Sequence, residues 1–195
     1  MVQAFTDAFL TCDADFTASS KKSGSTAVCA LIRDDTIYIA WLGDSTASLV
    51  REGVTVKVMD SHKPDRPDER ARVEGLGGTV IHWGAWRVNG QLAVRTDHDF
   101  RFNTWCHSAP GTLFLEMFSD PLNFQVSRAI GDGEYKPYVT AQPDITTIKR
   151  NGTEDFIIVA CDGLWDTITP EEATRFFLLS FKCPTSKHEN HSAHG

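Results

Sequence analysis

The sequence predicts a mixed α/β (α+β) domain in which most of the sheet is antiparallel. Four strand-like runs follow one another between residues 27 and 59 with only short polar connections, and parallel pairing would need long crossovers. Two later segments carry the start and stop signals of helices. With 195 residues, 41% of them hydrophobic, the chain can form one domain with a buried core, and two domains are not expected.

A short amphipathic helix is expected near the N-terminus, because residues 3–10 place two alanines and two phenylalanines at helical spacing. Four strands are expected next. The first two flank Asp34-Asp35, a length that suits a two-residue hairpin. Arg51-Glu52-Gly53 provides a similar turn between the third and the fourth. The four strands are expected at 27–33, 36–42, 45–51 and 54–59.

Start and stop signals in the sequence predict two further helices. Proline and acidic residues at the start, with glycine after the end, predict a helix that begins at Pro67 and stops before Gly77. The sequence Thr169-Pro170-Glu171-Glu172 has the form of a capping box and opens a helix to about Leu179. Three further strands, the last an unbroken apolar run typical of a buried strand, are expected at 79–83, 86–93 and 155–161.

The charge balance argues against several classes of function. The formal net charge is −7, whereas non-specific nucleic-acid binding and attachment to anionic membranes both need clustered Lys and Arg. No run approaches the roughly 20 apolar residues of a membrane span, and the N-terminus lacks the basic region of a signal peptide. We therefore expect an intracellular monomer, cytoplasmic or nuclear, that binds neither nucleic acid nor membrane.

The five cysteines are widely spaced and form no CxxC or Cys/His zinc pattern. Cys29 and Cys161 lie in apolar strand-like runs, so we expect reduced cysteines in the core. The seven histidines show no metal-ligand spacing either. Three of them lie in the polar tail 181–195, which we expect to be disordered and to bind metal only weakly and adventitiously.

Two aspartates stand where strand-like runs end. Asp44 follows the run 36–42 and Asp162 follows the run 155–161, each with a glycine beside it that lets the chain turn sharply. Two such carboxylates brought together would favour a hard cation such as Mg²⁺ or Mn²⁺. Gly-Asp and Asp-Gly are also ordinary turn dipeptides, and the spacing alone does not decide between a turn and a ligand.

Six sequence blocks occur in order: SGSTAV (23–28), AWLGDS (40–45), HKPDRPDERARVEGLGG (62–78), RVNGQLA (87–93), SRAIGD (127–132) and EDFIIVACDGLWD (154–166). In wording and order they resemble the protein phosphatase type 2C family of metal-dependent Ser/Thr protein phosphatases. Six ordered blocks make this resemblance far more specific than a single short motif. The wording WRVNGQLA is most similar to the subgroup that dephosphorylates calmodulin-dependent kinases.

The resemblance implies an antiparallel β-sandwich flanked by helices, with a two-metal centre of Mg²⁺ or Mn²⁺ at one end. In the family, metal-activated water attacks the phosphorus of phosphoserine or phosphothreonine, so phosphoproteins would be the substrates. By position, Asp162 matches an aspartate that binds the catalytic metal pair, and Asp44 matches one associated with a third, weaker metal. Thr46 stands where the family often has arginine, and that position is not a ligand.

Other conspicuous residues of these blocks are expected to be structural. Arg128 and Asp132 are expected to hold a loop near the site. His62, in the family's HKP block, is expected to pack or to form hydrogen bonds. Trp165 is expected in the core. No catalytic residue beyond the metal ligands is assigned.

Compared with the family, the sandwich is expected to be incomplete, as a partial type 2C phosphatase domain over residues 1–180. The DGHGG motif, whose aspartate bridges both metals, and the final aspartate of a GxxDN block do not occur in the sequence. Asp162 alone would bind Mg²⁺ weakly, because this ion needs six oxygen ligands. A sheet edge or a core face should also be left uncovered.

Residues 94–125 interrupt a stretch, LAVSRAIGD, that is continuous in the family. One hypothesis is a translated, retained intron, because Val94-Arg95 and the residues 122–125 can be encoded with a typical intron start and end. The alternative is a genuine surface loop, which a domain tolerates at small entropic cost.

Three interpretations of function remain open. The chain is an active phosphatase, a non-catalytic fragment or pseudophosphatase that binds a partner, or a product of aberrant splicing or of an incomplete gene model. The third is the interpretation adopted for the chain as written. The missing DGHGG motif separates the first interpretation from the other two.

Overall fold

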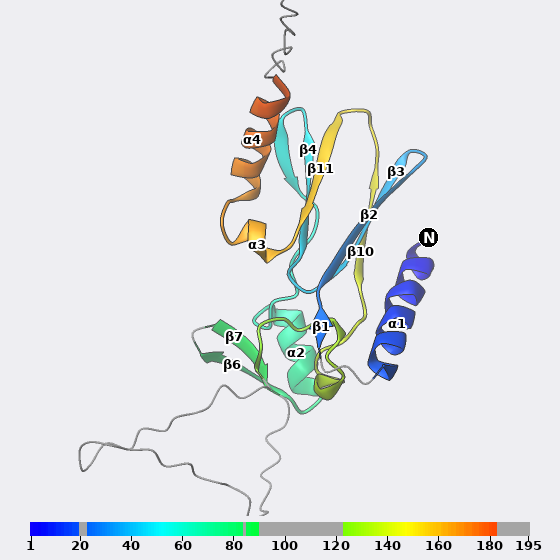
Figure 1. Cartoon of the computed structure of the whole chain (residues 1–195), viewed down its shortest axis with the longest axis vertical. Coiled ribbons are helices and arrows are strands. Elements are labelled where there is room, and N and C mark those ends of the chain that lie inside the picture. The colour runs from blue at the N-terminus through cyan, green and yellow to red at the C-terminus, as the bar shows by residue number, and fades with distance from the viewer. Residues whose placement is uncertain (20–22, 84, 90–122, 183–195) are drawn as a thin grey trace, which may run out of the picture.

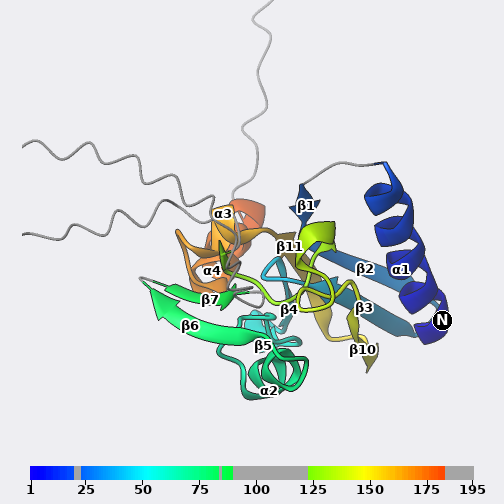
Figure 2. The ribbon, with the colours of Figure 1, turned by 90° about the horizontal axis from the view of Figure 1, so that it is seen from below.

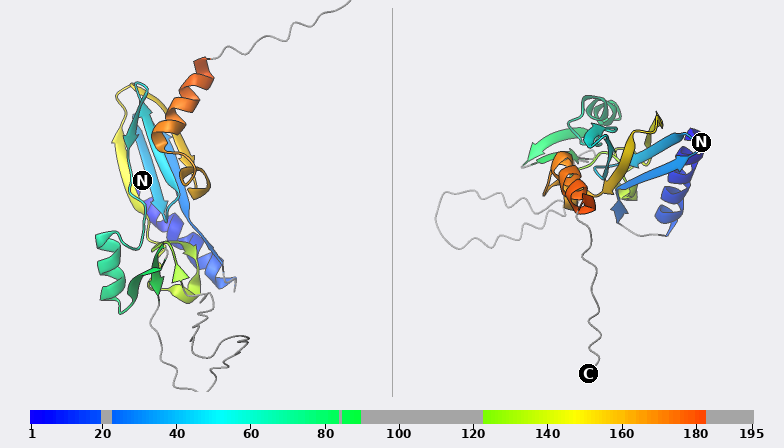
Figure 3. Two further views of the ribbon diagram at one scale, coloured as in Figure 1. Left: turned by 90° about the vertical axis from the view of Figure 1, so that its left-hand side faces the viewer. Right: turned by 90° about the horizontal axis from the view of Figure 1, so that it is seen from above.

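The computed structural model describes residues 1–19, 23–83, 85–89 and 123–182. Two three-stranded antiparallel sheets lie against each other, and α1 and α4 cover their outer faces (Figures 1 and 2). A smaller unit, with α2 and short strands, lies at one end of the two sheets, as the side view in Figure 3 also shows. The predicted class, an antiparallel sandwich flanked by helices, is confirmed.

The first sheet has the order β10-β3-β2 and consists of β2 (Ala27–Arg33), β3 (Thr36–Leu42) and β10 (Asp144–Lys149). The predicted hairpin joins β2 to β3 through Asp34-Asp35, with φ of +54° at Asp34. Strand β10 was not predicted from the sequence. Its threonines and flanking polar residues carry a weak hydrophobic signal, and pairing with β3 supplies what the local pattern lacks.

The second sheet has the order β11-β4-β5 and consists of β4 (Thr46–Arg51), β5 (Val54–Lys57) and β11 (Glu154–Ala160). Glu52 and Gly53 both have positive φ, as the two central residues of a tight hairpin turn require. The expectation that β11 is a buried strand is wrong. It lies at the sheet edge, where Ile158 is buried and Val159 is 45% exposed.

The main core lies between the two sheets and depends on the alternation of β3. Its odd-numbered residues Ile37, Ile39 and Trp41 face β4 and Met59. Its even-numbered residues Ala40 and Leu42 face α1 instead. Strand β3 is therefore central in its sheet and buried on both faces, which explains why its sequence is an apolar run.

Helix α1 (Val2–Ala18) is longer than the predicted 3–10, and it packs Phe5 and Phe9 on the outer face of the first sheet. Helix α4 (Pro170–Lys182) begins with the predicted capping box: Glu172 N–H donates to Thr169 Oγ1, and Thr169 N–H donates to Glu172 Oε2. Among the described helices, none has the length and apolar character needed to cross a membrane.

The smaller unit contains α2 (Pro67–Gly75), the predicted proline-to-glycine helix. Strands β6 (Thr79–Trp83) and β7 (Ala85–Asn89) form a hairpin beside it, and Asn123–Phe124 adds β8 to β7. The remaining short elements are β1 (Gly24–Ser25), β9 (Ile130–Gly131), a 3-10 turn (Gly133–Tyr135) and α3 (Asp162–Trp165).

Two of the predictions fall largely outside the described residues. Of the segment 94–125, residues 94–122 lie there, so its origin as a retained intron or a loop stays a prediction. The expected tail begins two residues inside α4, which ends at Lys182, and residues 183–195 lie outside the described part.

The cysteines within the described part of the chain are exposed. Cys12, Cys29 and Cys161 are free thiols at the surface, so the expectation that Cys29 and Cys161 are core residues is wrong. Cys29 lies on β2 and Cys161 directly follows β11, and both strands are sheet edges. The remaining two cysteines lie outside the described residues.

The packing of α1 on the first sheet predicts a large effect for Phe9→Ala. Phe9 is 9% exposed and contacts the core cluster of Ala40 and Leu42. Its truncation should lower the free energy of unfolding by about 3–5 kcal/mol in urea denaturation. Leu10→Ala is the matched control, because Leu10 is 41% exposed and should change stability by about 0.5 kcal/mol or less. Equal, small losses for both would contradict this packing.

Candidate functional site

The register of β4 and β11 brings the two predicted metal ligands to one place. The ladder ends with the pair Thr46 and Ala160. Asp44 lies two residues before Thr46, and Asp162 lies two residues after Ala160. Because antiparallel strands run in opposite directions, both aspartates leave the sheet at the same end. The structure therefore places the two predicted ligands at one end of the second sheet, where β4 begins and β11 ends.

Both carboxylates have oxygen atoms available for cation binding at this end of the sheet. The side chain of Asp44 is 14% exposed, and its Oδ2 lies 3.3 Å from Lys63 Nζ. Asp162 is exposed and opens α3, and its Oδ1 accepts a hydrogen bond of 2.8 Å from Gly163 N–H. Each carboxylate has further lone pairs beyond these contacts, so both can take part in binding a cation.

Trp165 fixes the end of the ladder that carries the two aspartates. Its indole Nε1–H lies 2.9 Å from the carbonyl oxygen of Ala160 and 3.2 Å from that of Thr46. These two residues form the last pair of the ladder, so one donor ties both strands together where they end. The sequence interpretation placed Trp165 in the core, but the residue is half-buried and holds the strand ends through this shared hydrogen bond.

Asp166 is a further acidic residue at this end of the sheet, and the sequence analysis gave it no role. Its N–H donates to the carbonyl oxygen of Asp162 at 2.7 Å. Asp166 follows Asp162 by four positions, which is the spacing of neighbours on one helical face. The signal was present in the sequence as the second carboxylate of CDGLWD, but only the helical turn brings it beside Asp162.

A buried carboxylate joins α2 to the loop that precedes β9. Glu69 is 1% exposed and accepts hydrogen bonds from Arg128, Arg72 and the Ser127 hydroxyl. The distance from Arg128 Nη2 to Glu69 Oε1 is 2.6 Å. Burial by itself would raise the pKa of Glu69, but these three donors outweigh it and lower the pKa to about 2. The carboxylate is therefore ionised and fully paired inside the fold.

Asp144, at the start of β10, belongs to the same network. It lies 3.0 Å from His62 Nε2, 2.8 Å from Arg128 Nη1 and 3.2 Å from Arg66 Nη2. The contact with His62, followed by the charge of Arg128, holds the pKa of Asp144 well below its usual range. Arg128 thus bridges Glu69 and Asp144, which agrees with the loop-holding role expected for it.

Asp132 is likewise structural. Its side chain is buried, its backbone has a φ of +50°, and its N–H donates to the carbonyl oxygen of Ser23. Burial raises the pKa of this carboxyl. It opens the short turn Gly133–Tyr135 and so fixes the end of the block SRAIGD.

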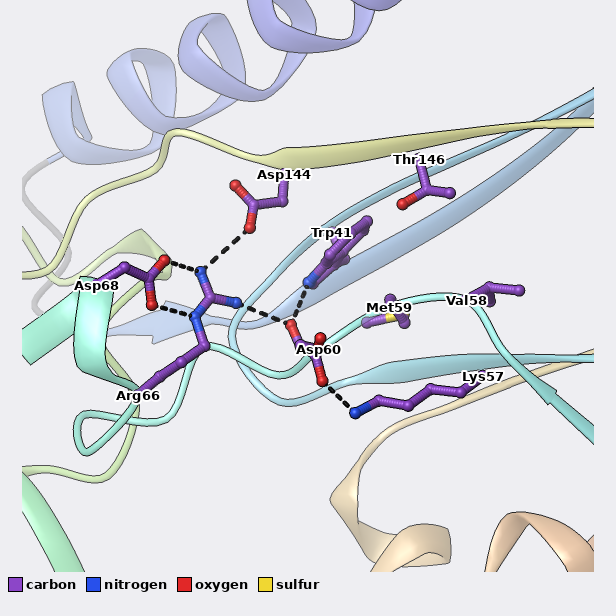
Figure 4. A pocket seen from close by; sticks show the side chains of 9 residues that line it. All are labelled: Trp41, Lys57, Val58, Met59, Asp60, Arg66, Asp68, Asp144 and Thr146. Atoms are coloured by element: carbon purple, nitrogen blue, oxygen red, sulfur yellow. Dashed lines mark hydrogen bonds and ion pairs between the residues drawn. The ribbon is translucent and has the colours of Figure 1, made fainter.

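A cavity of about 550 Å³ lies next to the charge network, and Asp44 and Asp162 do not line it. Figure 4 shows the guanidinium of Arg66 at its wall, bound to Asp68, to Asp144 and to the carbonyl oxygen of Asp60. Lys57 is paired with Asp60. Because its charged groups already pair with one another, this cavity is a weaker candidate for phosphate or metal binding than the ladder end.

The donor set fits part of a metal centre. Mg²⁺ and Mn²⁺ prefer carboxylate oxygens and water in six-fold coordination, and Asp44 and Asp162 are donors of this type. Across residues 1–19, 23–83, 85–89 and 123–182, however, no group of three His, Cys, Asp or Glu side chains is arranged to hold a metal ion. The described residues therefore suit a hydrated cation and leave most of its coordination sphere to other ligands.

Comparison with protein families gives a match to "Protein phosphatase 2C" over residues 1–182. Protein phosphatase 1E of Mus musculus is 41% identical over 156 residues, which are 80% of this chain and 17% of that protein. Protein phosphatase 1F of Homo sapiens is 39% identical over 173 residues, 87% of this chain and 31% of that protein. The chain thus spans less than a third of the length of these relatives.

Solved structures show a similar fold. A serine-threonine phosphatase 2C from Toxoplasma gondii superimposes with a TM-score of 0.74 at 22% identity, covering 92% of this chain and 56% of that one. A sex determining protein of C. elegans superimposes with a TM-score of 0.62 at 24% identity, covering 84% of this chain and 34% of that one. These likenesses support the sandwich architecture described above.

The buried charge network predicts a distinct dependence of stability on pH. The pKa of Glu69 is about 2 in the folded chain against an ordinary 4.5, so its contribution is present above pH 4.5 and is lost as the pH falls toward 2. Glu69→Gln should lower the free energy of unfolding at pH 7 by about 3–5 kcal/mol and flatten this acid decline.

The matched control for this prediction is Glu74→Gln on the same helix. Glu74 pairs with Arg70 at the surface, and both side chains are 46% exposed, so the cost should be about 1 kcal/mol or less. Urea denaturation between pH 2 and pH 7 measures both effects. An unchanged acid decline in the Glu69 variant would show that this carboxyl is not the group that titrates.

Proposed function

The chain belongs to the protein phosphatase 2C family, and from this premise we propose that it takes part in metal-dependent dephosphorylation of phosphoserine and phosphothreonine in proteins. The observation that carries the proposal is the position of Asp44 and Asp162, which leave the paired strands β4 and β11 at the same end. The family match over residues 1–182 supports it.

Asp162 and Asp44 are the residues proposed to hold the divalent cation, Mg²⁺ or Mn²⁺. Such an ion, when bound, supplies an activated water and neutralises charge on the phosphoryl oxygens. The protein's own part is positioning: Trp165 holds the strand ends, so the two carboxylates start from fixed backbone points. Lys63 lies 3.3 Å from Asp44 and balances its charge while no cation is near.

The substrate class is proposed from the relatives. Similarity to protein phosphatases 1E and 1F fits the subgroup suggested by the block WRVNGQLA. We therefore propose phosphorylated protein kinases of the calmodulin-dependent class as substrates. The chain spans less than a third of the length of these relatives. The activity and the substrate class of this chain are therefore proposals.

A second candidate function is binding of a phosphoprotein without turnover. It is favoured by the donor set, because within the described residues no three potential ligands are arranged around one metal position. A cation held by two carboxylates and water would still attract a phosphate group but would be poorly placed to activate the attacking water. The two candidates differ in hydrolysis, not in binding.

The proposal predicts that the purified chain hydrolyses a phosphothreonine peptide in the presence of Mn²⁺. Asp162→Asn should lower this rate by roughly 100-fold or more, because it removes a ligand of the cation. Asp155→Asn is the matched control: Asp155 lies at the far end of the same strand, where its Oδ2 accepts a hydrogen bond from Gly53 N–H. This variant should retain the rate.

Binding of the same phosphopeptide, measured by fluorescence anisotropy, separates the two candidates. Mn²⁺-dependent binding without hydrolysis, lost in Asp162→Asn, would support the non-catalytic function. Hydrolysis that persists in Asp162→Asn would contradict the assignment of the ligand. A folded chain that neither binds nor hydrolyses the peptide would contradict both candidates.

A further inference from the structure

His62 forms hydrogen bonds with both backbone polar groups of Gly43, the residue before Asp44. Its N–H donates to His62 Nδ1 at 3.1 Å, and its carbonyl oxygen accepts from His62 N–H at 2.8 Å. The φ of Gly43 is +83°, and an added Cβ would lie 2.2 Å from Thr26 Cγ2. The backbone that leads into Asp44 therefore has one conformation, and one residue holds it from both sides.

His62 is buried and is held by a ring contact, a nearby carboxylate and backbone hydrogen bonds. The residue is 0% exposed, its ring stacks on Trp41 with centroids 5.9 Å apart, and its Nε2 lies 3.0 Å from Asp144 Oδ2. Its carbonyl oxygen accepts hydrogen bonds from the N–H and the hydroxyl of Ser127. The ring thus connects the charge network of Glu69, Arg128 and Asp144 to the backbone at Gly43.

These contacts determine which ring nitrogen carries the proton. Burial, despite the nearby Asp144, lowers the pKa of His62, so the ring is neutral at neutral pH. A neutral imidazole has one N–H and one acceptor nitrogen. Because Nδ1 accepts from Gly43 N–H, the proton lies on Nε2, which is 3.0 Å from Asp144 Oδ2 but not in hydrogen-bond geometry with it.

We propose that His62 is a positioning residue that sets the direction of Asp44 through the hydrogen bond between its Nδ1 and the Gly43 N–H. The proposal rests on the proposed function in one respect, namely that Asp44 binds a divalent cation. Among the described residues, no partner of the Asp44 side chain defines its place as firmly, because its contact with Lys63 involves an amino group on a half-exposed side chain. Its position therefore follows from the backbone that His62 holds.

Two substitutions at His62 separate the two ring nitrogens. In His62→Asn the amide Oδ1 is as many bonds from Cβ as Nδ1 is, so it can still accept from Gly43 N–H. In His62→Gln the amide Nε2 reaches toward Asp144, but no acceptor remains at the Nδ1 position. Both variants lose the ring and its stacking on Trp41, so each is the packing control for the other.

The first readout is amide hydrogen exchange at Gly43 and Asp44, which needs no metal. Exchange at Gly43 should stay slow in His62→Asn and become at least roughly tenfold faster in His62→Gln, because a lost hydrogen bond of about 1.4 kcal/mol corresponds to a factor of ten. Equal exchange in the two variants would overturn the proposal, since His62 would then act by packing alone.

The second readout is the affinity for Mn²⁺ from water-proton relaxation. His62→Gln should weaken it by roughly 10-fold or more, as for other residues that orient metal ligands, and His62→Asn by much less. If the exchange pattern is found but the unmodified chain does not bind Mn²⁺, the positioning role of His62 stands and the proposed metal function fails. If Mn²⁺ binds equally well to both variants, the positioning role fails and the function stands.

A measurement on the unmodified chain covers the case in which a variant does not fold. The ¹⁵N chemical shifts of the imidazole nitrogens should show Nδ1 without a proton and Nε2 with one. A protonated Nδ1 would overturn the proposal, because that nitrogen could not accept a hydrogen bond from Gly43.

Discussion

The antiparallel register between β4 and β11 is the constraint on which the candidate site depends. Asp44 and Asp162 are 118 positions apart in the sequence (162 − 44), and nothing local brings them together. The pairing that ends at Thr46 and Ala160 does so, and the indole of Trp165 holds that final pair closed. A shift of the register by one residue would turn the side chains of the shifted strand to the other face of the sheet and change the position of Asp162 relative to Asp44.

The charge network of Glu69, Arg128 and Asp144 supports the end of the second sheet that carries Asp44. Glu69 and Asp144 are held by three arginines that come from α2, from its N-cap and from the segment before β9. Buried ion pairs of this kind are weak evidence for stability, because desolvation offsets much of their attraction. Their value here is geometric: they fix His62, and His62 fixes the backbone before Asp44.

Local signals predicted the elements that depend on local chemistry. The hairpin at Asp34-Asp35, the capping box at Thr169 and the helix that begins at Pro67 were all legible in the sequence and are confirmed. Whether a strand is central or at an edge depends on distant pairing. For that reason β10 was missed, β11 was expected to be buried, and Cys29 and Cys161 were placed in the core.

The sequence predicted only part of the site, because the site also depends on distant pairing. Asp44 and Asp162 were recognised as carboxylates that follow strand-like runs, but only the register shows that they lie at the same end of the sheet. The hydrogen bonds of Trp165 and the position of Asp166 depend on the turn of α3, and a four-residue helix is too short to show a periodicity in the sequence.

A titration with Mn²⁺ followed by NMR tests the proposed cation site most directly. Paramagnetic broadening should begin at residues 43–46 and 160–166, whereas broadening that begins at the cavity residues 57–60, Arg66 and Asp68 or at the C-terminal histidines would contradict this site.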